Sequence, residues 1–224
     1  MAYKVFTNGS VLNASEINDN LMNQSVMVFS NSTARAAALT SPLEGMLTWL
    51  QDTNKYEYRD GSGAWVALGS SPIIQVVSTA KTDTFTSSSG TFVDVTGLSV
   101  TITPTSATSK VLVQLSVNGN GGTASSSMIG RLLRGATAVA IGDAAGSRER
   151  ATFGNSIAVG SSDILNNAVT FLDSPATTSA TTYKIQVKSD SSPNLVYINR
   201  SSNDGDNINR ARTLSTITVM EIAG

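Results

Sequence analysis

The sequence predicts a mainly β protein, in which a short N-terminal helix and a small β-meander precede a larger antiparallel β-sandwich. Ser and Thr make up 58 of the 224 residues, and this composition favours exposed strand faces and polar loops over helices. Hydrophobic and polar residues also alternate with a period of two over many short segments after residue 72. Such alternation is typical of strands that have one buried and one exposed face.

A short helix is expected within residues 15–29, because this segment contains neither Gly nor Pro. Asn13 can cap it, and Glu16 follows three residues later, as in a capping box. The apolar stripe of this helix is narrow and comprises Ile17, Leu21 and Val28. A narrow stripe suits a helix that packs against copies of itself or against a partner. A surface helix that packs on its own domain is the alternative, with equal weight.

Three aromatic-rich segments predict the β-meander, and they are residues 45–50, 56–59 and 64–68. The residues between them, 52–54 and 60–63, are rich in Asp, Asn and Gly, which favour turns. This region holds both tryptophans and two of the five tyrosines. Clustered aromatic rings can form a sugar-binding platform. We favour the interpretation that they supply apolar area to a very small sheet.

Residues 69–72 (Gly-Ser-Ser-Pro) have the composition of a linker, so we expect one region at residues 1–70 and a second domain at residues 73–224. Alternation is clearest at residues 98–103, 111–118 and 183–188. Further strand-like runs are found at residues 128–134, 138–141, 157–159, 165–172, 195–200 and 214–222. About eight to ten short strands separated by turns indicate an antiparallel sandwich.

The last strand-like run differs from the others because both of its faces are apolar. Ile217 and Val219 lie on one face, and Leu214, Met220 and Ile222 lie on the other. In a sandwich, the core buries only one face of each strand. The second face is therefore expected to contact another subunit.

Composition excludes several classes of function. The chain contains no His and no Cys, which removes Ser-His and Cys-His catalysis, thiol chemistry and ordinary zinc sites. Only 14% of the residues are charged and the net charge is −1, so a general nucleic-acid binder is not expected. The apolar run at residues 26–29 is far too short for a signal peptide or a membrane span. We expect a soluble, unexported protein that is not an enzyme and holds no cofactor or metal.

One polar cluster in a predicted loop is a candidate metal site. Residues 203–207 could hold calcium, but their spacing does not complete a calcium loop and a plain turn is favoured.

Arg148 and Arg150 lie in a loop and could bind phosphate or uronate groups of a host polysaccharide. The alternative is that the arginines of the second domain pair with acidic residues, namely Glu149, Asp204, Asp206 and Glu221. Glu149 with Asp143 or Asp163 could form a glycosidase pair, but nothing in the sequence brings them together.

Both ends of the chain resemble proteins of bacteriophage particles. The N-terminal part resembles the attachment segment of tail and fibre proteins in FTNGSVLNASEIN (residues 6–18), QSVMVF (24–29), PLEGM (42–46) and DGSGAW (60–65). The C-terminal part resembles the knob of such virion proteins in YINRSSNDGDN (197–207) and STITVMEI (215–222). No repetitive shaft lies between the two parts. The sequence therefore does not decide between a tail fibre and a capsid-bound head fibre.

This resemblance implies a homotrimer whose head is a jelly roll similar to tumour necrosis factor and complement globular heads. It implies that residues 1–70 attach to other tail or capsid proteins, that the knob binds host surface polysaccharide, and that the protein is located in the virion after assembly in the host cytoplasm. Neither nucleic acid nor membrane insertion is expected. A glycan-cleaving tailspike is the less favoured alternative. The trimer interface is expected at Ile17, Leu21, Ile217 and Val219.

Overall fold

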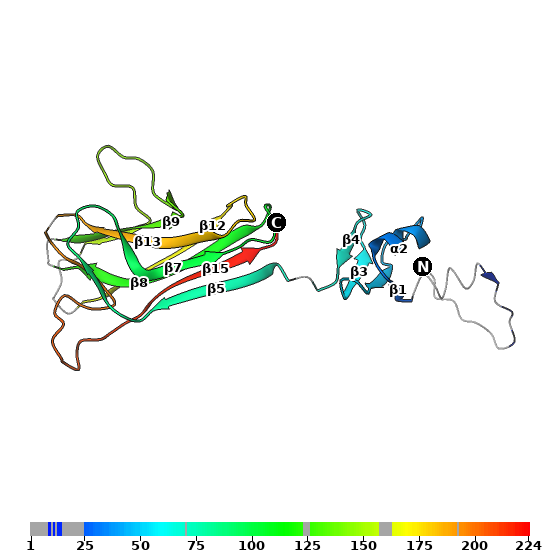
Figure 1. Cartoon of the computed structure of the whole chain (residues 1–224), viewed down its shortest axis with the longest axis horizontal. Coiled ribbons are helices and arrows are strands. Elements are labelled where there is room, and N and C mark those ends of the chain that lie inside the picture. The colour runs from blue at the N-terminus through cyan, green and yellow to red at the C-terminus, as the bar shows by residue number, and fades with distance from the viewer. Residues whose placement is uncertain are drawn as a thin grey trace. The chain divides into compact units, whose positions relative to one another are not determined.

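The computed structural model (Figure 1) describes Gly9, Val11, Asn13 and Ala14 and residues 25–69, 71–122, 126–156, 163–191 and 193–224. The chain divides into two compact units, Met1–Ser70 and Ser71–Gly224, which are called the N-terminal and C-terminal units below. The predicted fold class is confirmed: a short helix and a small sheet precede a sandwich of two antiparallel sheets. Within the described residues no helix is long and apolar enough to cross a membrane.

The described part of the N-terminal unit, residues 25–69, is a four-stranded sheet with the short helix α2. Its elements are β1 (Met27–Phe29), α2 (Ser32–Ala38), β2 (Leu47–Leu50), β3 (Lys55–Arg59) and β4 (Trp65–Ala67). The strand order is β1-β2-β3-β4. Strands β2, β3 and β4 form the predicted meander, and β1 pairs with β2 in parallel, so the small sheet is mixed.

The expected position of the helix was wrong at its C-terminal end. Met27–Phe29 form strand β1 instead of the last helical turn, because this apolar run pairs with β2. The described helix begins at Ser32, where the side chain of Asn31 accepts a hydrogen bond from the backbone N–H of Ala34 at 2.8 Å. Residues 15–24, which carry the rest of the expected helix, lie outside the described residues.

A buried arginine ties α2 to the small sheet. Arg35 forms an ion pair with Glu57 at 2.5 Å and donates a hydrogen bond to Thr48 Oγ1 at 3.1 Å. Its guanidinium group also lies 4.1 Å from the ring centre of Trp65. Among the described residues of this unit, only the hydrophobic side chains of Met46 and Leu50 are fully buried, at 5% and 2% exposure. The apolar core of this unit is therefore very small.

The C-terminal unit is built from eleven described strands. They are β5 (Ile73–Lys81), β6 (Phe85–Ser87), β7 (Val93–Ile102), β8 (Lys110–Gly121), β9 (Ser127–Arg134), β10 (Thr137–Val139), β11 (Phe153–Ser156), β12 (Leu165–Asp173), β13 (Thr181–Ser189), β14 (Val196–Ile198) and β15 (Ser215–Ile222). One sheet, the β8 sheet, runs β5-β15-β8-β12, and in addition short β14 pairs with β8 and short β6 pairs with β14. The other, the β9 sheet, runs β7-β13-β9, with short β10 and β11 beside β9.

The pairing order identifies the sandwich as a jelly roll. Without the short strands β6, β10 and β14, the first strand pairs with the last (β5 with β15) and the second with the second-last (β7 with β13). The third strand pairs with the sixth (β8 with β12), and the fourth with the fifth (β9 with β11). All of these pairs are antiparallel, as expected when one long hairpin is wound into two sheets. The expectation of a jelly roll is thus confirmed.

The sandwich core consists of alternate residues from both sheets, as the period-two pattern predicts. Its fully buried side chains include Leu98, Ile102, Val113, Val117, Met128, Leu132, Ile185, Ile198, Ile217 and Val219. Because side chains alternate along a strand, the neighbours of these buried residues point away from the core. The two outward faces of the sandwich follow from this alternation.

Candidate functional site: the outward face of the β8 sheet

The outward face of the β8 sheet is broad and almost without charge. Register and alternation place sixteen side chains on it, from β5 (Val76, Ser78, Ala80), β15 (Thr216, Thr218, Met220, Ile222), β8 (Lys110, Leu112, Gln114, Ser116, Asn118) and β12 (Asn166, Ala168, Thr170, Leu172). Lys110, at one end of β8, is the only charged residue among them. Four adjacent strands therefore present a surface of small, hydroxyl, amide and apolar groups.

These side chains form rows across the four strands. One row is apolar and consists of Val76, Met220, Leu112 and Leu172. The next row carries hydroxyl and amide groups and consists of Ser78, Thr218, Gln114 and Thr170. A third row is made of small residues, which are Ala80, Thr216, Ser116 and Ala168. The apolar row is open to solvent at its two ends, where Val76 is 56% and Leu172 is 49% exposed. Such a row on an exposed sheet face is typical of a surface that contacts another protein.

The outward face of the β9 sheet has the opposite character. Lys184 forms an ion pair with Asp94 at 2.8 Å, and Lys188 forms one with Glu149 at 2.6 Å. Arg131 donates two hydrogen bonds to Gln186 Oε1, and its guanidinium group lies 4.0 Å from the ring centre of Phe92. Charged groups that pair with one another across strands are typical of a face in contact with water. The two outward faces of this sandwich therefore differ in charge.

The expected trimer interface at Ile217 and Val219 was wrong in its choice of strand face. Both side chains are fully buried in the core of a single chain, so neither is available to a second subunit. They alternate along β15 with Thr216, Thr218, Met220 and Ile222, which lie on the outward face instead. The other two residues of the expected interface, Ile17 and Leu21, lie outside the described residues.

The two arginines that were expected to bind a receptor are both exposed, but they differ in their contacts. Arg150 Nε donates a hydrogen bond to the carbonyl oxygen of Gly142 at 2.7 Å, so this side chain closes its own loop. Arg148 is exposed. Glu149 between them is taken up by its ion pair with Lys188. The two guanidinium groups therefore do not have equivalent roles.

This difference can be tested with single substitutions. We expect Arg150→Ser to speed amide hydrogen exchange at residues 142–151 several-fold, because the loop loses a hydrogen bond from a charged donor. We expect Arg148→Ser to leave this exchange unchanged and, if the loop binds host polysaccharide, to weaken adsorption to cells. Equal exchange rates in both variants would contradict a structural role for Arg150.

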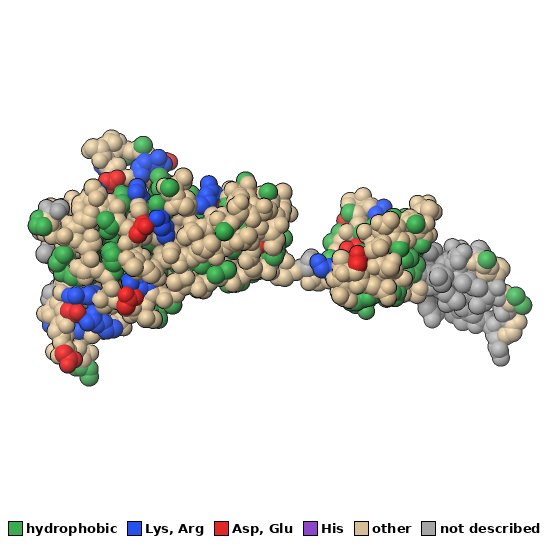
Figure 2. Space-filling view, in the orientation of Figure 1, with side chains coloured by type: hydrophobic (Ala, Val, Ile, Leu, Met, Phe, Trp, Pro, Cys, Tyr) green, Lys and Arg blue, Asp and Glu red, His purple; other side chains and the backbone are tan. Residues whose placement is uncertain are grey.

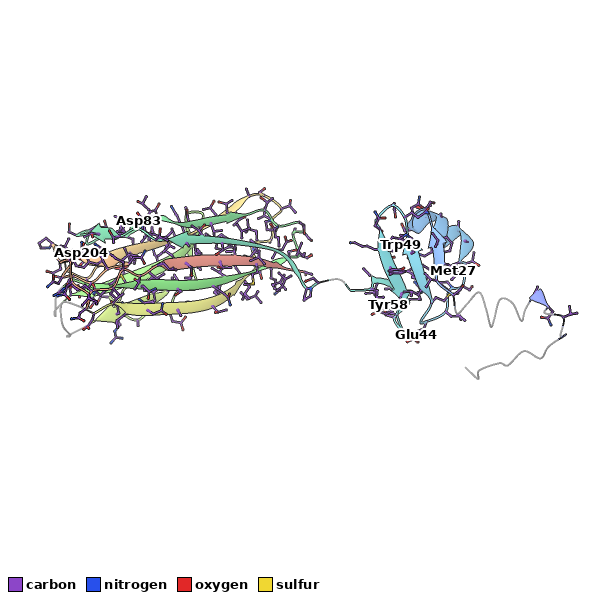
Figure 3. All side chains as sticks on the ribbon, turned by 90° about the horizontal axis from the view of Figure 1, so that it is seen from below. Met27, Glu44, Trp49, Tyr58, Asp83 and Asp204 are labelled. Atoms are coloured by element: carbon purple, nitrogen blue, oxygen red, sulfur yellow. The ribbon has the colours of Figure 1, made fainter. Side chains whose placement is uncertain are left out.

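A second polar loop, residues 199–213, is held by ion pairs and lies at the end of the sandwich away from the C-terminus, where Figure 3 labels Asp204. Asp204 forms ion pairs with Arg200 at 3.2 Å and with Arg212 at 2.7 Å. Figure 2 shows basic and acidic side chains gathered at one end of the sandwich. Within the described residues no three acidic side chains are placed to hold one metal ion. Pairing with Asp204, the alternative for the arginines of this domain, accounts for Arg200 and Arg212.

Glu221 is a buried carboxylate that faces the sandwich interior at the end near the C-terminus. It accepts hydrogen bonds from Gln75 Nε2 at 2.6 Å and from both the backbone N–H and the hydroxyl of Thr105 at 2.7 Å. Burial alone raises the pKa of Glu221, but the hydrogen bonds outweigh burial and lower the pKa to about 2. The carboxylate therefore stays charged and joins β5, β15 and the β7–β8 connection without an arginine partner.

Asp173, at the end of β12, is the second buried carboxylate of the sandwich. It accepts two hydrogen bonds from Arg134, at 2.8 and 2.9 Å, and one from the hydroxyl of Tyr183 at 2.6 Å. Burial and the hydrogen bond to Asp173 raise the pKa of Tyr183. This cluster connects three strands of the two sheets. Sequence patterns did not indicate it, because its members are distant in the chain and lie on different strands.

Comparison with known proteins gives distant similarity to solved structures. No protein family and no curated protein matches this chain. Among solved structures, it is similar to a chain in the structure of infectious bursal disease virus Gx strain, with 12% sequence identity and a TM-score of 0.35. The alignment covers 75% of this chain and 43% of that chain, so this chain spans less than half of the length of its match.

Proposed function

We propose that this chain is a non-enzymatic structural protein of a bacteriophage particle. In this proposal it is a trimeric tail fibre, whose N-terminal region docks on the tail and whose C-terminal unit binds the host surface through its loops. The proposal joins the resemblance of residues 6–65 and 197–222 to virion fibre proteins with the jelly-roll fold of the C-terminal unit.

The outward face of the β8 sheet is the observation that carries this proposal. A monomer gains nothing from an uncharged row such as Val76, Met220, Leu112 and Leu172 on its surface, whereas an assembly buries that row and gains hydrophobic free energy. The neighbouring Ser, Thr and Ala side chains are small, so flat sheets of several copies can approach closely. Three copies that meet through this face leave the charged β9 sheet and the loops exposed to solvent and host.

Several features support a binding role over catalysis. The chain lacks His and Cys. Both buried carboxylates, Glu221 and Asp173, are saturated with hydrogen bonds from neighbouring strands. Glu149 is engaged by Lys188. Carboxylates held in this way stabilise the fold, whereas a glycosidase needs one protonated acid and one free carboxylate.

The proposal is tested by mass and by location. Light scattering of the purified protein should give three times the chain mass of 23.3 kDa, and antibody-labelled electron microscopy of intact particles should find the protein on the tail. Incubation with host polysaccharide should release no reducing ends. A monomeric mass would contradict the assembly, label on the capsid would favour a head fibre, and released reducing ends would indicate a tailspike enzyme.

A further inference from the structure

The small sheet of the N-terminal unit has one face that no described element covers. Register places six side chains on it in two rows, which are Val28, Trp49 and Tyr56 in the first and Leu47, Tyr58 and Val66 in the second. The helix α2 lies on the opposite face, where Arg35 contacts Thr48, Glu57 and Trp65. Figure 3 shows Trp49 and Tyr58 on this sheet. This surface, named the aromatic face below, is partly open to solvent, since Val28 is 58% and Tyr56 is 45% exposed.

The aromatic face suits a protein partner better than a glycan. None of its six side chains is charged, because the charged residues of β3 (Lys55, Glu57 and Arg59) alternate onto the α2 face. The rings of Trp49 and Tyr56 are 4.7 Å apart at their centres and tilted by 59°. The two rings are tilted against each other and do not form one flat platform. A sugar ring stacks on a flat ring face, whereas a protein surface fills an uneven apolar one.

The unit needs this face to be covered. Met46 and Leu50 are the only fully buried hydrophobic side chains among its described residues, and a sheet of this size with so small a core is marginal on its own. Oligomerisation is a common way for such small units to gain stability. The aromatic face carries more apolar side chains than the core itself. Burial of this face would therefore add to the stability of the unit.

We propose that the small sheets of neighbouring copies of this chain pack on one another through the aromatic face and form a second assembly interface. This inference rests on the proposed trimer. Each small sheet is joined to its sandwich by the short segment at residues 68–72, so assembled sandwiches keep their small sheets at an effective concentration on the order of millimolar. An uncharged face can also meet a copy of itself without repulsion between like charges. Other copies are thus the partner that is always within reach.

The absence of cysteine in the chain gives a direct test. In the full-length protein, Tyr58→Cys introduces a single thiol on the aromatic face, and a short bismaleimide should link copies of this variant on a denaturing gel. Lys55→Cys is the matched control, because it lies on the same strand but on the opposite face, and should stay unlinked. Val28→Cys gives a second thiol on the aromatic face, at the edge strand, if Tyr58→Cys does not fold.

The two tryptophans provide an independent readout, since both belong to the N-terminal unit. If copies bury Trp49, its emission should be blue-shifted in the assembled protein and should shift to the red when the assembly is diluted to monomers. A protein that is trimeric by light scattering, but is unlinked through either thiol and emits like exposed tryptophan, would overturn this inference and leave the proposed function intact. A monomeric mass at all concentrations would instead overturn the proposed trimer.

Discussion

Replacing Glu221 by Ala is expected to destabilise the C-terminal unit by about 3 kcal/mol, because the change leaves buried donors without their acceptor. The carboxylate accepts hydrogen bonds from Gln75 and, twice, from Thr105. It thereby holds the first strand and the β7–β8 connection against the last strand. Chemical denaturation at one fixed protein concentration measures the loss. Glu149→Ala is the matched control: its ion pair with Lys188 lies on the outward face, and its removal should cost less than about 1 kcal/mol.

The pH dependence of stability gives a second readout of the same group. The pKa of Glu221 is lowered from 4.5 to about 2 in the folded protein. A lowered folded pKa means that the charged carboxylate contributes its full stabilisation above the unfolded value and loses it as the pH falls toward 2. The difference in unfolding free energy between the natural protein and Glu221→Gln should therefore shrink between pH 4.5 and pH 2. A constant difference over this window would show that Glu221 does not titrate there.

The sandwich was predictable because its signal is local. Alternation along segments such as residues 111–118 and 183–188 marks each strand without knowledge of its neighbours. The winding of these strands into a jelly roll depends on pairs that are distant in sequence, such as β5 with β15. Periodicity contains no information about such pairs. That part of the fold came from the resemblance to virion proteins.

Alternation also does not say which face of a strand is inside. On β15 both faces carry apolar residues, so the pattern predicts cover for both faces without distinguishing them. Ile217 and Val219 point inward because they lie opposite Leu115 and Val113 of the neighbouring strand β8, which are themselves core residues. The side chains on the outward face of β15 are Met220, Ile222 and two threonines. Only the register between strands distinguishes the two faces.

The N-terminal region shows the limits of short apolar runs. Residues 26–29 fit a helix by their lack of Gly and Pro, but Met27–Phe29 form a strand because β2 offers a partner. The alternation of side chains along the strands also places the aromatic residues of the meander on two different faces of the sheet. Trp65 packs under Arg35, whereas Trp49, Tyr56 and Tyr58 lie on the face away from α2. The sequence interpretation, which assigned these rings to the apolar area of the sheet itself, could not foresee this division.

The same substitution by Asp at two neighbouring residues on β15 should have different effects: at Thr218 it should weaken assembly, and at Ile217 it should prevent folding. Thr218 lies in the middle of the outward face, in register with Ser78 and Gln114. In a monomer the side chain of Thr218→Asp reaches water, so the fold should survive with a loss of no more than about 1 kcal/mol. In an assembly through this face, several carboxylates would lie together in a place without water or counter-charge. Such burial costs several kcal/mol, so the dissociation constant should rise by at least ~100-fold.

Ile217→Asp places the same charge in the core of one chain, where the side chain is 0% exposed and its neighbours are apolar. We expect this variant to lose its cooperative melting altogether, because an unpaired buried carboxylate costs more than most domains of this size can lose. Thr101→Asp on the exposed face of the β9 sheet is the control, and should change neither mass nor melting temperature. Light scattering and circular dichroism of the three variants read assembly and folding separately. If Thr218→Asp stays trimeric with unchanged concentration dependence, the copies do not meet through the outward face of the β8 sheet.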